Sequence, residues 1–98
     1  MTLTVNNKVY TTERVVESYN MEFDSSNIRL EIFLADDVAA PAMNELTAAF
    51  EAIGTGSFTV ENNEPVTKTF SGYTVVSITN DMEEQSSNYC VLLTKPAL

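Results

Sequence analysis

The sequence lacks most of the residues on which enzymes depend. Its 98 residues include no histidine, no tryptophan and a single cysteine, Cys90. Without histidine the chain lacks the commonest general base, proton shuttle and zinc ligand. One cysteine can form neither a structural zinc site nor an intrachain disulfide. The phosphate-loop, dinucleotide and serine-hydrolase patterns GxxxxGK[ST], GxGxxG and GxSxG are also missing. These absences predict a protein that is not an enzyme and that uses no metal and no cofactor.

Long apolar segments are missing as well. The longest uninterrupted apolar run, Tyr89–Leu93, has five residues, whereas a membrane-spanning helix needs about 20. The first ten residues alternate between apolar and polar types, which is unlike the basic start and apolar run of a signal peptide. We therefore expect one soluble domain over residues 1–98, located in a reducing cytoplasm, where a lone cysteine is ordinary.

Positive charge is scarce. Five Lys and Arg residues face 14 Asp and Glu residues, which gives a formal charge of −9. Nucleic-acid phosphates and anionic membranes would be repelled by such a surface, so direct binding to either is not expected. A basic protein surface is the natural electrostatic partner. A second interpretation, in which the acidic surface serves solubility alone, stays open at this stage.

Alternating apolar residues predict strands in the first and last thirds of the chain. Asn6-Asn7 is typical of a turn or a bulge, and the cluster Asp24–Asn27 is typical of a turn. Glu17 interrupts the apolar face of the second strand. The predicted strands cover about residues 3–9, 14–23, 28–34, 57–61, 66–70, 73–79 and 88–94. The last of these is apolar on both faces, which favours a place in the centre of the sheet and a core position for Cys90.

A helix is predicted between the two groups of strands. Pro41 fits the first turn of a helix, so the helix begins near Ala39 or Ala40, and Gly54 is suited to end it. Asp36 and Asp37 precede it, where helices favour capping acceptors and negative charge. Its apolar stripe consists of Ala39, Ala42, Met43, Leu46, Ala49, Phe50 and Ile53.

Together these patterns predict an α+β fold. We expect a mostly antiparallel β-sheet of six to seven strands, with one α-helix over about residues 39–53 packed on one face. The side chains expected to form the core are Leu30, Ile32, Leu46, Phe50, Ile53, Tyr73, Val91 and Leu93.

Two segments of the chain resemble each other. Residues 21–27 (MEFDSSN) match residues 82–88 (MEEQSSN) at five of seven positions, and each copy precedes an apolar strand. A β-unit/helix/β-unit repeat would explain this similarity, although chance identity among small polar residues is an alternative. Both segments are acidic turns, and their spacing suggests rows of carboxylates that stand in for nucleic-acid phosphates. The residues predicted to face a basic partner are Glu22, Asp24, Asp81, Glu83 and Glu84.

Residues 69–78 (TFSGYTVVSI) and the strand that ends in VLLTKP at residues 91–96 resemble small proteins carried by phages and prophages of Gram-positive bacteria. The resemblance covers about a third of the chain, and it implies a genetic setting more than an activity. One function found in that setting is inhibition of host defence by small acidic anti-CRISPR proteins, some of which mimic DNA. The alternative is a structural protein of the virion or tail module that self-assembles, in which case exposed apolar residues such as Phe33 would matter more than acids.

Overall fold

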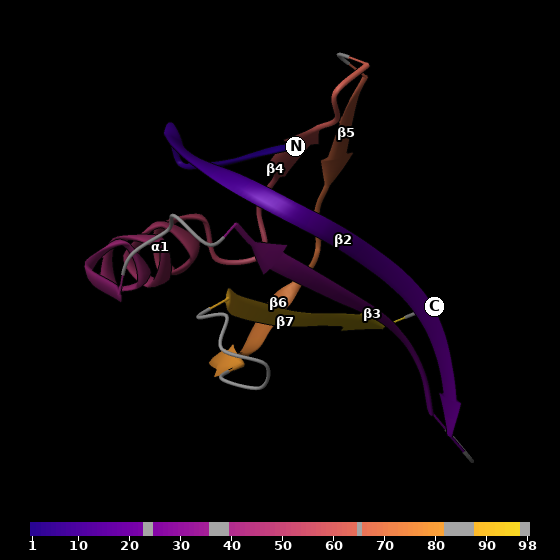
Figure 1. The fold of residues 1–98 in the computed structure, drawn as a ribbon. Coiled ribbons are helices and arrows are strands. Elements are labelled where there is room, and N and C mark those ends of the chain that lie inside the picture. The colour runs from indigo at the N-terminus through magenta and orange to yellow at the C-terminus, as the bar shows by residue number, and fades with distance from the viewer. Residues whose placement is uncertain (23–24, 36–39, 65, 82–87, 97–98) are drawn as a thin grey trace.

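The computed structural model describes residues 1–22, 25–35, 40–64, 66–81 and 88–96, with the side chains of all of these except 20–22, 25–26, 40–41, 80–81 and 88. Within these ranges the chain forms seven strands and one helix (Figure 1). The predicted α+β class, with its antiparallel sheet and single helix, is confirmed. The elements are β1 (Thr2–Val5), β2 (Lys8–Glu22), β3 (Ser25–Leu34), α1 (Ala40–Ile53), β4 (Phe58–Glu61), β5 (Thr67–Phe70), β6 (Thr74–Asp81) and β7 (Asn88–Pro96).

The long strand β2 connects two halves of the sheet. The strand order is β5-β4-β1-β2-β3-β7-β6, and all neighbours are antiparallel. Residues 8–11 of β2 pair with β1, and the residues from Thr12 onward pair with β3. The register shifts between Thr12 and Arg14, and such a bulge bends a strand. Figure 1 shows β2 curving along the molecule, with β1, β4 and β5 beside its start and β3 beside its end.

The turn between β1 and β2 is the Asn6-Asn7 pair, which divides the strand expected over residues 3–9: β1 ends at Val5, and β2 begins at Lys8 and runs through to Glu22. Both residues have a positive φ, 48° and 66°, and they connect Val5 to its partner Lys8 as a two-residue hairpin loop. Asparagine tolerates this left-handed conformation better than most residues, which is why it is favoured in such turns.

The helix α1 follows the predicted stripe. Met43, Leu46, Ala49 and Phe50 are buried. The helix ends where Gly54 adopts a φ of 59° and its N–H donates to the Phe50 carbonyl at 3.0 Å. Asp36 and Asp37, the predicted capping residues, lie outside the described residues.

The core lies between the two halves of the sheet and α1. Seven of the eight predicted core residues are buried, whereas Ile53 is half-buried because it occupies the last turn of α1. An aromatic cluster joins β4, β5 and α1. The centre of the Phe58 ring lies 5.4 Å from that of Phe50 and 5.5 Å from that of Phe70. Burying each large side chain contributes about 1.5–3 kcal/mol. The core residues absent from the prediction are Leu3, Val5, Tyr10, Leu34, Met43, Ala49, Phe58, Val60 and Phe70.

The strand β7 differs from its prediction in two respects. It lies second from the end of the sheet, between β3 and β6, rather than in the centre. Val91 and Leu93 point into the core, and alternation along the strand directs Cys90 to the opposite face, where it is half-buried. Cys90 is therefore not a core residue.

The strands on either side of α1 pair in the same way. A shift of 61 positions, taken from the two similar sequence segments, carries the pair Val16↔Glu31 of the β2–β3 hairpin onto Ser77↔Leu92 of the β6–β7 hairpin. In the same manner β1 pairs with the start of β2, and β4 pairs with β5. Equivalent strands also pair with each other, β1 with β4 and β3 with β7, both antiparallel. The two halves are thus related by an approximate two-fold axis, in which β5 and β6 together correspond to β2.

Candidate functional site

The structure places the strand ends that lead into the two predicted acidic turns at opposite ends of the β3–β7 pair. Glu22 ends β2 opposite Ser25, and Asp81 ends β6 opposite Asn88. The turn predicted over Asp24–Asn27 is therefore wrong for Ser25, Ser26 and Asn27, which pair with β2 and belong to β3. Between these hairpins, the start of β3 lies beside the end of β7, because Asn27 pairs with Pro96. The backbone therefore does not bring Glu22 and Asp81 together, although the approximate two-fold axis makes their positions equivalent. Asp24, Glu83 and Glu84 lie outside the described residues, as do the side chains of Glu22 and Asp81.

Every basic residue of the chain has an interaction within the protein. Three of them form ion pairs: Lys8 with Glu45 at 3.6 Å, Arg29 with Glu31 at 3.4 Å and Lys68 with Glu17 at 3.1 Å. The other two lie over aromatic rings, Arg14 over Phe33 at 4.3 Å and Lys95 over Tyr73 at 4.7 Å.

The acids outnumber these cations on the surface. Glu51, Glu61 and Glu64 are exposed, and none of them forms an ion pair with a cation in the described part of the chain. Their carboxylates face solvent and contribute directly to the negative potential of the protein.

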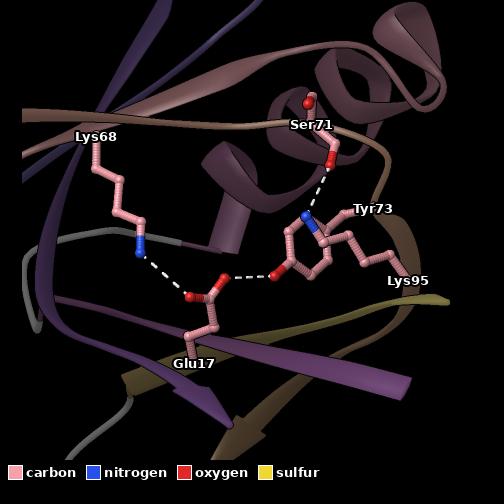
Figure 2. A network of polar contacts seen from close by, with 5 residues as sticks. All are labelled: Glu17, Lys68, Ser71, Tyr73 and Lys95. Carbon is pink, nitrogen blue, oxygen red and sulfur yellow. Dashed lines mark hydrogen bonds and ion pairs between the residues drawn. The ribbon is translucent and has the colours of Figure 1, made fainter. Parts of the chain in front are cut away.

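The most connected polar group in the described structure is Glu17 (Figure 2). Its Oε1 accepts a hydrogen bond from Lys68 Nζ at 3.1 Å, and its Oε2 accepts one from the Tyr73 hydroxyl at 2.6 Å. Glu17 belongs to β2, Lys68 to β5, and Tyr73 directly precedes β6, so three distant segments meet at one carboxylate. Lys95 Nζ lies over the Tyr73 ring and donates to the Ser71 carbonyl at 3.4 Å. These five residues are called the Glu17 group below.

These contacts shift the pKa values in opposite directions. The hydrogen bond from Tyr73 lowers the pKa of Glu17 below its ordinary value, the neighbouring lysines lower it further, and partial burial opposes both. Burial, followed by the hydrogen bond to Glu17, raises the pKa of Tyr73. Glu17 is thus a weak base and Tyr73 a weak acid near neutral pH, which is the reverse of what acid–base catalysis needs.

The Glu17 group therefore serves to connect the two halves of the sheet. Both carboxylate oxygens are occupied, and the Tyr73 side chain is buried. Only one feature of the sequence pointed to this group, namely that Glu17 breaks an otherwise apolar strand face. Nothing in the sequence indicated its partners, because Lys68 and Tyr73 are more than 50 positions away.

Two cavities flank the core. One lies beside Glu17, between β2 and the β4–β5 hairpin, with Val15, Val60 and Phe70 among its lining residues, and has a volume of about 280 Å³. The other lies between α1 and β6 and has a volume of about 350 Å³. In the described ranges there is no cluster of three or more His, Cys, Asp or Glu residues that could hold a metal ion.

Searches against protein-family models, curated proteins and solved structures find no match to this chain. Among the described residues, no helix is long and apolar enough to cross a membrane.

Proposed function

We propose that this protein is a non-enzymatic, acidic binding protein of phage origin that acts in the host cytoplasm. Its partner is a basic protein that handles nucleic acid, and binding inhibits that partner by occupying the surface on which nucleic acid would lie. This places it with the small anti-CRISPR-like inhibitors that act as DNA mimics.

The observation that carries the proposal is the state of the charged side chains. All five basic residues interact within the protein, and three of them each form an ion pair with one carboxylate. Of the acids that remain, Glu51, Glu61 and Glu64 are exposed on the folded part of the chain that the structure describes, and such a scaffold can present carboxylates at fixed spacing. A basic groove that evolved to bind phosphates would be attracted to such a surface.

The predicted contact residues can be tested in two groups, because the hairpins that carry them end on opposite sides of the sheet. One variant combines Glu22→Gln with Asp24→Asn, and a second combines Asp81→Asn, Glu83→Gln and Glu84→Gln. A third variant, with Glu61 and Glu64 changed to Gln, serves as the control that removes the same charge as the first variant elsewhere on the surface.

The affinity-tagged protein would first be used to capture a basic partner from a Gram-positive host, and that partner would then be purified. If the proposal holds, duplex nucleic acid displaces the protein from the partner. Neutralising a contacting hairpin slows association severalfold and flattens its dependence on salt, since charges are screened over about 8 Å at physiological ionic strength. Association rates that are equal for all three variants and the parent across a salt series would assign the charge to solubility alone.

The structure also favours one alternative, a virion or tail-module protein that self-assembles. Beyond Thr12, β2 pairs with β3 on one edge, and no described strand pairs with its other edge. Tyr19, on this part of β2, is 62% exposed, and a long open edge of this kind is a template for another chain. Phe33 contributes less than the sequence suggested, because it is half-buried beneath Arg14. Light scattering coupled to size-exclusion chromatography separates the two functions: a ring or fibre supports assembly, and a monomer or dimer supports inhibition.

A further inference from the structure

The cavity between α1 and β6 has the shape of a binding crevice. Its walls are the C-terminal half of α1 and the first half of β6, and its volume is about 350 Å³. This size is at the lower end of the range for binding sites in proteins. The residues that decide its chemistry are Thr47, Phe50 and Glu51 of α1 and Thr74, Val75 and Ile78 of β6.

One wall of this crevice belongs to an edge strand of the sheet. The strand β6 is the last in the sheet and pairs with β7, and no other described strand pairs with it. The register between β6 and β7 shifts between Val75 and Ser77. This bulge at Val76 explains how Val75 and Ile78, three positions apart, both line the crevice. A bulge interrupts the regular ladder and twists an edge away from a long partner, so only a short segment can pair here.

The charge of the crevice indicates what would bind there. Glu51 is its charged lining residue, is exposed, and forms no ion pair with a described cation. The walls beside it are apolar, and the whole chain carries a charge of −9. An occupant that complements these features presents an apolar side chain next to a basic one. A second copy of this chain fits poorly, because its five basic residues already interact within their own protein.

We propose that the crevice binds a short, extended, basic segment of the partner, which adds to β6 as a further strand. The backbone of the segment would pair with the open edge of β6, an apolar side chain would enter between Phe50 and Ile78, and a lysine or arginine would reach Glu51. Strand addition of this kind obtains affinity from main-chain hydrogen bonds and specificity from pockets for alternate side chains. The inference rests on the proposed function in one respect, that the partner is basic.

The test uses a defined probe, the acetylated and amidated heptapeptide Lys-Val-Lys-Val-Lys-Val-Lys, added to the ¹⁵N-labelled full-length protein. We expect amide shifts to be confined to the segments Thr47–Thr55 and Thr74–Thr79. Glu51→Gln should weaken binding about two- to fivefold, the effect of an exposed ion pair. The same change at Glu64 should leave affinity within about twofold of the parent. A peptide with Glu in place of Lys should not bind.

A second pair of peptides tests the strand geometry. Successive N–H groups of a strand point to opposite edges, so methylating the nitrogens of the valines removes donors on one edge, and methylating those of the lysines removes donors on the other. One methylated peptide should lose binding and the other keep it, whereas equal effects would overturn strand addition. Shifts centred on residues 13–19 of β2, or no shift with about 1 mM peptide, would overturn the assignment to this crevice.

These results are separable from those of the proposed function. The peptide experiment needs no partner, so it can fail while the partner still binds through the acidic hairpins. Conversely, a crevice that binds the peptide retains that property even if no basic partner is found.

Discussion

The two halves of the molecule share their strand pairing, but different residues lie in the equivalent spaces beside the start and the end of β2. In one half, α1 lies against β1 and its Glu45 reaches Lys8 at the start of β2, while the crevice separates α1 from β6. In the other half no described helix fills the equivalent space, between the end of β2 and the β4–β5 hairpin, and Glu17 bridges it instead. The chain thus uses an apolar helix on one side and a polar group on the other.

The difference is clearest at two lysines in equivalent positions. Lys8 begins β2 just after its turn, and Lys68 occupies the matching place in β5, since Lys8 pairs with Val5 of β1 and Lys68 pairs with Val60 of β4. Lys8 reaches Glu45 on α1, whereas Lys68 reaches Glu17. The 61-position shift that matches the two hairpins places Ile78 where the other half has Glu17. An apolar side chain is suited to a space that a helix covers, and a carboxylate is suited to a space that water reaches.

The largest effect is expected on the helical side. Leu46 is fully buried on the core-facing side of α1, and Leu46→Asp would place an unpaired charge in the core. The penalty is comparable to the whole stability of a domain, about 5–15 kcal/mol, so cooperative unfolding should be lost. Leu46→Met should cost less than about 1.5 kcal/mol. Urea titration followed by circular dichroism measures both, and a cooperative Leu46→Asp transition would show that the helix packs less tightly than the structure indicates.

The next comparison uses two tyrosines. The Tyr73 hydroxyl donates to Glu17 at 2.6 Å, so Tyr73→Phe should cost about 1–2 kcal/mol. Burial, followed by the nearby Glu45 carboxylate, raises the pKa of Tyr10, but no hydrogen bond of regular geometry joins the two groups. Tyr10→Phe should therefore be neutral or slightly stabilising. Equal losses in the two variants, measured by the same urea titration, would mean that the halves do not differ in this way.

The pKa shifts predict how pH affects the Glu17 side. The pKa of Glu17 is lowered from an ordinary value of 4.5 by its contacts in the folded protein. Its contribution is therefore fully present above about pH 4.5 and is lost as pH falls through the folded-state pKa. The pKa of Tyr73 is raised from 10.0, so its contribution is present below pH 10 and is lost as pH rises further. The difference in the free energy of unfolding between the parent and Glu17→Gln should shrink in acid. Denaturant titrations at several pH values between pH 2 and pH 7 measure this difference. A difference independent of pH would exclude an ionised Glu17 in the fold.

Local patterns predicted the elements of this fold well. The α1 stripe, the Gly54 stop and the Asn6-Asn7 turn each depend on a few adjacent residues, so the sequence shows them directly. The sheet order depends on pairing across the chain, and no pattern indicated that β1 would pair with β4. The short strands β4 and β5 supply the buried residues Phe58 and Phe70. Their polar neighbours in the sequence leave no apolar pattern that would predict this burial.

The candidate site was predictable only in part. The hairpin segments Met21–Asn27 and Met82–Asn88 showed a repetition that is also present in the strand register. Charge composition indicated a basic partner without locating a surface for it. The Glu17 group and the α1–β6 crevice are formed by segments that are distant in sequence, and they become visible only when the curvature of β2 brings the halves together.

The smallest expected effect concerns the two equivalent lysines themselves. The Lys8–Glu45 pair is more than half exposed on both sides and spans 3.6 Å, so a double-mutant cycle with Lys8→Gln and Glu45→Gln should give a coupling energy of about 0.2–0.5 kcal/mol. The Lys68–Glu17 pair is shorter, at 3.1 Å, and its carboxylate is held by Tyr73. A cycle with Lys68→Gln and Glu17→Gln should therefore give a larger coupling, about 0.5–1 kcal/mol. Adding salt should weaken the first coupling more than the second, because a fixed, partly buried carboxylate is screened less than an exposed one. If the Lys8 coupling is the larger at both low and high salt, α1 rather than Glu17 provides the stronger electrostatic closure.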